Sequence, residues 1–320
     1  MTMTNCDRTD QADPRPQVSH PVELLSPNAP TVATAALDIV WFQVGGTICN
    51  LRCHHCFIHC SPENDAFAFM PLDQCLPFLT EAAELGVKEY YFTGGEPFAN
   101  PELCDILELT LREYGPATVL TNATLLRPNT LDRLRRMHDS LSRPLELRVS
   151  LDGYCAKMND PIRGEGTFEQ AMNGVIKLVD CGFSPIITIA RTWEGKDERV
   201  LSDFVATLTA RGYPNPRLKI LPLLKLGAET ERTGSYCDQA WVTHDMMAGF
   251  DQQNLVCHNA RLVTDQGVWV CPILPDSPAA RMGATLRETI REYPLRHQAC
   301  HTCWSNGAIC SNTSVLTTPA

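Results

Sequence analysis

The chain has 320 residues, of which 44% are hydrophobic and 20% charged, a balance typical of a folded globular protein rather than a disordered one. Its formal net charge is −10 and no Lys/Arg-rich run occurs, which argues against a dedicated nucleic-acid binder. No segment approaches the roughly 18 consecutive apolar residues of a membrane span, and the N-terminus lacks the features of a signal peptide. The unusual count is 15 cysteines, which without a secretion signal indicates metal binding or catalysis rather than a disulfide scaffold.

Short apolar runs alternate with helical periodicity along most of the chain. Residues 1 to about 35 are rich in Pro, Asp, Thr and Ala, and we expect them to form a flexible arm. The pattern after this arm predicts strands at 37–43, 88–92, 117–121, 145–150, 184–190 and 217–224. It predicts helices at 72–86, 101–115, 128–137, 167–182 and 197–212.

This alternation predicts an α/β fold. Six strand–helix units with right-handed crossovers predict a partial (β/α)6 TIM-like barrel over residues 36–254, with functional sites at the C-terminal ends of the strands. After about residue 254, cysteines and short turns replace the alternation. We therefore expect a small C-terminal domain over residues 255–320.

The first group of cysteines directly follows the first predicted strand. Cys49, Cys53 and Cys56 form a C-x3-C-x2-C array. Three thiolates on a tight loop can ligate three irons of a [4Fe–4S] cluster, which leaves the fourth iron open to a substrate or cofactor. Zinc is the main alternative, although this spacing fits common zinc sites poorly. Cys60 introduces an ambiguity, since Cys53, Cys56 and Cys60 form C-x2-C-x3-C; we take Cys60 as a non-ligand.

Polar segments at the following strand ends complete a pattern. FTGGEPF ends the second strand, LTNATLL the third and VSLDG the fourth, and NDPIRGEGTF follows. With the cysteine array, these segments resemble the radical S-adenosylmethionine (radical SAM) superfamily over roughly residues 37–310. Two positions depart from the family pattern: Ala123 stands where Gly is usual, and Asn159 where His is usual.

The resemblance implies that S-adenosyl-L-methionine binds at the open iron of the first cluster. It implies carbonyl contacts from the glycine-rich segment to the methionine ammonium, and a contact from Arg163 to the methionine carboxylate. The histidines beside the array are expected to pack around the cluster or near adenine. The implied cofactor-binding residues are His55, Gly94, Gly95, Glu96, Pro97, Thr121, Asn122, Ser150, Asp152 and Arg163.

The C-terminal cysteines resemble the twitch or SPASM auxiliary domain of the same superfamily. Two of them flank a strand–turn–strand pattern with Gly267 at its turn, in a C-x9-G-x3-C arrangement that is one residue shorter after the glycine than the family pattern. A C-x2-C pair follows. The resemblance implies an auxiliary [4Fe–4S] cluster, without an open iron, on Cys257, Cys271, Cys300 and Cys303. A structural zinc site is the alternative, and Cys310 could replace one ligand.

The resemblance implies an enzyme that generates a 5′-deoxyadenosyl radical and abstracts hydrogen from carbon, with an external electron donor such as flavodoxin or ferredoxin. We expect a small polar substrate, such as a sugar, aminoglycoside or polyol, and epimerisation or dehydrogenation. The alternative is a maturase that crosslinks or epimerises a ribosomal peptide. A metal-holding adaptor without catalysis fits the ordered motifs poorly. We expect a cytoplasmic location, without nucleic-acid or membrane partners.

The polar loop after the sixth predicted strand contains a candidate catalytic residue. Cys237 lies in a polar loop after the sixth strand, which should overhang the barrel mouth. A thiol there could donate a hydrogen atom to a substrate radical, with Cys155 as a weaker candidate. The same loop carries Glu229, Glu231 and Arg232, which could hold a polar substrate.

Overall fold

In a computed structural model of the protein, the described residues are 24–34, 36–307, 309–312 and 314–316. Most of the arm expected over residues 1–35 lies outside these ranges. Its described part contributes strand β1 (Thr31–Val32), which pairs antiparallel with β11 (Tyr293–Pro294). No helix of the described part is long and apolar enough to cross a membrane.

The predicted partial barrel is confirmed. Consecutive strands pair in parallel, each with the next along the chain. These strands are β2 (Ile39–Phe42), β3 (Glu89–Phe92), β4 (Ala117–Thr121), β5 (Leu145–Ser150), β6 (Ile186–Ala190) and β7 (Arg217–Leu221). Parallel pairing brings all their C-terminal ends to one rim, which is where the sequence motifs lie.

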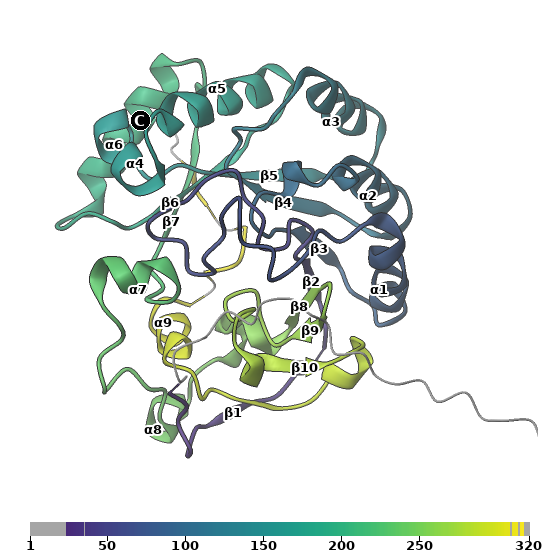
Figure 1. Cartoon of the computed structure of the whole chain (residues 1–320), viewed down its shortest axis with the longest axis vertical. Coiled ribbons are helices and arrows are strands. Elements are labelled where there is room, and N and C mark those ends of the chain that lie inside the picture. Colours follow the sequence, from purple (N-terminus) through teal and green to yellow (C-terminus); the bar gives the residue numbers. More distant parts are fainter. Residues whose placement is uncertain (1–23, 35, 308, 313, 317–320) are drawn as a thin grey trace, which may run out of the picture.

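The crossover helices lie around the outside of the strands (Figure 1). They are α1 (Leu72–Glu84), α2 (Leu103–Leu109) with a π-helical turn (Thr110–Tyr114), α3 (Pro128–Ser140), α5 (Thr167–Asp180) and α6 (Asp197–Ala210). The sequence pattern missed α4 (Ala156–Arg163), because Pro161 and its polar neighbours resemble a turn. Short 3-10 turns lie at Pro97–Ala99, Gln252–Asn254, Val256–His258, Pro278–Ala280 and Arg287–Thr289.

The strands of the barrel bury an apolar face beneath these helices. Side chains alternate between the two faces of a strand, and in β5 the residues Leu147 and Val149 join the helix-side core while Arg148 is excluded from it. Phe42 and Phe92 stack within the same core, with ring centroids 5.5 Å apart. Burial of this continuous apolar layer drives the assembly of the barrel wall.

The C-terminal part continues the barrel sheet. The strand–turn–strand pattern is confirmed as β8 (Ala260–Thr264) and β9 (Gly267–Trp269), and β8 pairs in parallel with β2. The sheet then ends with β10 (Arg281–Gly283). At its other edge, β12 (Val315–Leu316) pairs antiparallel with β7. One ten-stranded sheet therefore crosses the boundary expected near residue 254.

The remaining helices lie beside this extension. They are α7 (Ala228–Thr233), α8 (His244–Met247) and α9 (Gln298–Asn306). Sequence periodicity does not predict these helices, because each segment is too short to show a helical repeat of apolar residues. Helix α9 is the element that carries the C-x2-C pair.

Ala123 provides a test of the local backbone. Its φ of +58° lies in the left-handed region that disfavours a Cβ. We expect Ala123→Gly to raise the free energy of unfolding by about 1 kcal/mol, measured by urea denaturation of the reconstituted protein. The same substitution at Ala206, an exposed residue in the interior of α6, should lower it by about 1 kcal/mol. Equal destabilisation by both substitutions would contradict the strain at Ala123.

Candidate active site

The loop after β2, which carries the first cysteine array, is held by the loop after β3. The Gly95 amide donates to the Gly46 carbonyl at 2.9 Å, and the Glu96 amide donates to the Ile48 carbonyl at 3.0 Å. A bond from the Cys49 amide to the Ser61 carbonyl, at 3.1 Å, closes the other side of the array. The cysteine loop is therefore shaped by backbone hydrogen bonds.

The glycines of the second loop allow this contact. A Cβ on Gly95 would lie 2.0 Å from the Ile48 carbonyl oxygen. Gly94 has a φ of +133°, and a Cβ on it would lie 2.7 Å from the Gly45 Cα. In the structure these glycines let the two loops pack against each other, and the close approach of a ligand expected from the sequence stays a prediction.

The thiols of the array lie together at the rim. The Cys49 sulfur accepts hydrogen bonds from the Leu51 amide at 3.4 Å and the Asn122 side chain at 3.8 Å. Burial raises the pKa of Cys49 to about 12 and that of Cys53 to about 11. Buried thiols of this kind ionise when a cation binds them, so the array fits an iron cluster.

Cys60 is a fourth thiol at this position. Its side chain donates to Cys56, and this bond is the main reason why the pKa of Cys56 falls to about 6. The Cys60 amide also donates to the Cys56 sulfur at 3.3 Å. This arrangement suits a thiol that supports a ligand, and the assignment of Cys60 as a non-ligand stays a prediction.

Asp152, at the end of β5, anchors a buried charged group. Its Oδ2 lies 2.6 Å from the Arg163 Nε and 2.8 Å from the His55 Nε2, and its Oδ1 accepts from the Ala190 amide at 2.8 Å. Burial favours the neutral acid, but Arg163 and His55 outweigh this effect and hold the pKa of Asp152 well below its usual range. Arg163 also hydrogen-bonds the Cys53 thiol.

Glu96 connects two strand ends. Its buried carboxylate accepts from the Thr121 hydroxyl and the Asn122 amide, each at 2.7 Å, and from the Phe98 amide at 3.0 Å. Burial raises the pKa of Glu96, although these donors oppose the shift. Pro97 is buried at the start of the following 3-10 turn. Glu96 is one of the expected cofactor-binding residues, but in the structure its carboxylate binds protein groups of the two neighbouring strand ends.

Asn159, where the family pattern has His, is fully buried. Its Oδ1 accepts from the Asp152 amide at 3.1 Å, and its Nδ2 donates to the Thr167 hydroxyl at 3.0 Å. It therefore joins the end of β5 to the start of α5. Ser150, at the same strand end, is half-buried and level with Thr188 of β6 in the sheet register.

The polar loop after β7 contacts the cysteine loop. The Ala228 amide donates to the Cys56 carbonyl at 2.9 Å. Within α7, Glu229 is fully buried and forms two 2.8 Å hydrogen bonds with Arg232. Glu229 and Arg232, two of the three side chains expected to bind substrate, therefore bind each other. Sequence periodicity gives no signal of this pair.

Cys237 lies in the same loop, in contact with α9. The residue is exposed, and its carbonyl accepts from the Gln298 side chain of α9 at 2.9 Å. Its expected role as a hydrogen donor stays a prediction.

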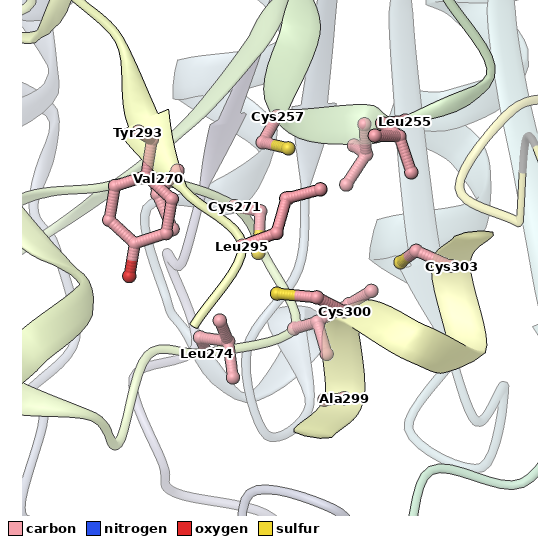
Figure 2. A pocket seen from close by; sticks show the side chains of 12 residues that line it. Leu255, Cys257, Val270, Cys271, Leu274, Tyr293, Leu295, Ala299, Cys300 and Cys303 are labelled. Carbon is pink, nitrogen blue, oxygen red and sulfur yellow. The ribbon is translucent and has the colours of Figure 1, made fainter. Parts of the chain in front are cut away.

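A second group of cysteines surrounds an apolar cavity (Figure 2). Its walls include Leu255, Val270, Leu274 and Leu295, and the four expected ligands Cys257, Cys271, Cys300 and Cys303 line it together. Burial raises the pKa of Cys257 to about 11 and that of Cys271 well above its usual range. Cys310 interacts electrostatically with three of these cysteines.

The two sets differ from a compact single-ion site. Within the described ranges, no group of three or more Cys, His, Asp or Glu side chains is close enough to hold one metal ion. A cubane cluster separates its ligand sulfurs more widely than a single ion does.

Comparisons with known proteins agree with this geometry. A protein-family model described as "Radical SAM superfamily" matches residues 44–197. The chain is 31% identical over 135 residues to the antilisterial bacteriocin subtilosin biosynthesis protein AlbA of Bacillus subtilis, covering 42% of this chain and 29% of AlbA. It is 28% identical over 138 residues to the mycofactocin maturase MftC of Mycobacterium tuberculosis, covering 43% and 34%. A probable GTP 3′,8-cyclase of Archaeoglobus fulgidus is 33% identical over 43% of this chain and 44% of that protein.

Solved structures show the same fold. Streptococcus suis SuiB bound to precursor peptide SuiA aligns with a TM-score of 0.62 at 16% identity, covering 82% of this chain and 66% of SuiB. Native anSMEcpe with bound AdoMet aligns with a TM-score of 0.57 at 14% identity, covering 78% and 79%. The chain spans about a third of the length of AlbA and MftC.

The contact between the two loops can be tested at Gly95. We expect Gly95→Ala to lose most of the iron bound after anaerobic reconstitution, because the added Cβ displaces the Ile48 carbonyl. Gly86→Ala is the control for backbone strain away from the array: its φ of +80° disfavours alanine, but a Cβ there meets nothing within 4 Å, so this variant should keep its iron. Iron and sulfide analysis measures both. Full iron content in Gly95→Ala would show that the packing of the loops does not position the array.

Proposed function

From the membership of this chain in the radical SAM superfamily, we propose that it abstracts a hydrogen atom from a peptide substrate. The observation that best supports this proposal is the array of Cys49, Cys53 and Cys56. It lies on one loop at the C-terminal rim of the barrel, and backbone hydrogen bonds hold that loop in place. When bound, a [4Fe–4S] cluster and S-adenosyl-L-methionine supply a 5′-deoxyadenosyl radical.

The chain's own residues hold this site in shape. We assign Cys49, Cys53 and Cys56 as the cluster ligands. Asn122 donates to Cys49 and Arg163 to Cys53, so both support ligand sulfurs. The proposed contact of Arg163 with the methionine carboxylate would have to share the guanidinium with Asp152.

The remaining cofactor contacts come from backbone and side chains at the rim. We propose that the carbonyls of Gly94 and Gly95 accept from the methionine ammonium. Ser150 and Asp152 lie at the end of the neighbouring strand, where they suit contacts to ribose, and His55 lies against Asp152. Glu96, Pro97 and Thr121 keep this rim in place through the bonds described above.

For the second cavity we propose an auxiliary [4Fe–4S] cluster on the four cysteines that line it. The apolar walls would keep water from the cluster, and all four protein ligands would leave no open iron. Pairing of β8 with β2 fixes this cavity relative to the barrel.

A peptide substrate is favoured over a small polar molecule by the relatives. AlbA and MftC are named for bacteriocin biosynthesis and mycofactocin maturation, and SuiB is seen with a precursor peptide. The small polar substrate expected from the sequence is supported by the similarity to a GTP 3′,8-cyclase and to an AdoMet-dependent heme synthase. A crosslink, an epimerisation or a dehydrogenation would each begin with the same hydrogen abstraction.

The cysteine assignments predict iron content and cofactor cleavage. The wild-type protein should bind about eight irons, and Cys49→Ala, Cys53→Ala or Cys56→Ala about four. These three variants should form no 5′-deoxyadenosine with dithionite, whereas the helix cysteine variant Cys75→Ala should match the wild type. Substitution of Cys257 or Cys271 should halve the iron and retain cleavage. Cleavage by the Cys49, Cys53 and Cys56 triple variant would refute the assignment.

The substrate class can be tested with perdeuterated cell extract divided into peptide and non-peptide fractions. We expect deuterium transfer into 5′-deoxyadenosine, measured by mass spectrometry, from the peptide fraction, and loss of the transfer after protease treatment. Transfer only from the non-peptide fraction would instead establish the small-molecule function. With the active fraction, Cys237→Ala should stop product formation but retain cofactor cleavage if Cys237 is the hydrogen donor.

A further inference from the structure

A buried arginine lies beside the cysteines of the second cavity. Arg261, in β8, is 0% exposed, although arginine is almost never fully buried without a paired charge. Its Nη1 donates to the Cys257 carbonyl at 2.8 Å, which ties the guanidinium directly to one of the proposed cluster ligands. The guanidinium also interacts electrostatically with the thiols of Cys257 and Cys271. Arg261 is therefore part of the surroundings of the proposed auxiliary cluster.

Neutral oxygens accept every hydrogen bond that this guanidinium donates. Nε and Nη2 donate to the Thr289 carbonyl at 3.2 and 2.9 Å. Nη1 donates to the Ala260 carbonyl at 2.6 Å as well as to Cys257, and Nη2 also donates to the Thr34 hydroxyl. These bonds use the five N–H donors of an arginine. The guanidinium is thereby fixed in one position, with no donor left for a carboxylate.

The hydrogen bonds of Arg261 do not cancel its charge. In the described part of the chain, no carboxylate lies within ion-pair distance of it. The charged groups that act on it are the two thiols and Arg291, a second cation. A buried charge without a counter-charge is costly, even when its donors are satisfied. An anion beside the guanidinium would remove this cost.

The proposed auxiliary cluster fits as this anion. Cys257 and Cys271 ionise when iron binds them, so negative charge develops next to Arg261. A cubane held by four thiolates is an anion, and reduction makes it more negative. The reduction potential of such a cluster depends on the charges and hydrogen bonds around it. A fixed cation in a buried site acts strongly on it, because water screens little of the interaction.

We propose that Arg261 is the electrostatic partner of the auxiliary cluster and raises its reduction potential. This inference rests on the proposed function, since it requires the auxiliary cluster to be present. The cation stabilises the reduced cluster more than the oxidised one, because the reduced cluster carries more negative charge. A higher potential makes the auxiliary cluster a better electron acceptor.

Thr34 allows the charge of Arg261 to be neutralised without removal of the arginine. Thr34→Asp puts a carboxylate where the hydroxyl accepts from the Arg261 Nη2, and Thr34→Asn puts a neutral group of the same size there. A second pair of variants changes the arginine itself. Arg261→Gln and Arg261→Lys both lose most of the hydrogen bonds, but only Arg261→Lys keeps the charge. Each pair separates the effect of charge from the effect of altered packing.

The measurement is a redox titration of the anaerobically reconstituted full chain, followed by electron paramagnetic resonance. The signal that Cys271→Ala removes identifies the auxiliary cluster, and the signal that Cys53→Ala removes identifies the radical cluster. In Thr34→Asp, the ratio of reduced to oxidised auxiliary cluster at a fixed potential should fall about tenfold, which is about 59 mV for one electron. Arg261→Gln should shift in the same direction.

The neutral and charge-conserving variants are the controls. Thr34→Asn should keep the wild-type potential, and Arg261→Lys should stay closer to it than Arg261→Gln. The potential of the radical cluster should not change in any of the four variants. If Arg261→Gln does not retain the auxiliary cluster, the two Thr34 variants still decide the question.

Three results would overturn the proposal: a wild-type auxiliary potential in Thr34→Asp, an equal shift in Thr34→Asn, or an equal shift of the radical cluster. With both signals present, any of them refutes the role of Arg261 and leaves the proposed function intact. A wild-type protein without the signal that Cys271→Ala should remove would refute the auxiliary cluster of the proposed function, and the role of Arg261 with it.

Discussion

The backbone contact between the loops after β2 and β3 is the interaction on which the candidate site depends. Two amide–carbonyl bonds, Gly95 to Gly46 and Glu96 to Ile48, shape the cysteine loop. The buried Glu96 carboxylate extends the contact to β4 through Thr121 and Asn122. Three strand ends thereby form one rigid rim. Such preorganisation is what a cluster with an open iron requires, because its cofactor must be held in one orientation.

The second cysteine set is tied to the same framework. Since β8 pairs with β2, the strand that leads into the first array also supports the hairpin between Cys257 and Cys271. Residues 309–312 form a segment that contacts the barrel, where Arg148 of β5 donates from Nη1 to the Cys310 carbonyl at 3.0 Å. Cys310 belongs to that segment and interacts with cysteines of the second cavity.

Much of the architecture could be predicted from sequence because its signals are local. Strand periodicity predicted β2 to β7, and cysteine spacing predicted the set that lines the second cavity. The roles of single residues could not be predicted in this way. Glu96 and Asn159 act through partners distant in the chain, and the Glu229–Arg232 pair is buried only because α7 packs on the cysteine loop. Arg148 resembles an ordinary strand residue in the sequence, but in the structure it is buried on the strand face opposite the helix-side core.

The central claim is that two separate cysteine sets hold two clusters, of which only the first has an open iron. Mössbauer spectroscopy of protein reconstituted with ⁵⁷Fe, with and without S-adenosyl-L-methionine, tests it most directly. The account predicts two [4Fe–4S] clusters per chain and a shift of one iron site, in one cluster only, when the cofactor is added. A spectrum with a single cluster, or one in which the cofactor perturbs no iron site, would contradict it.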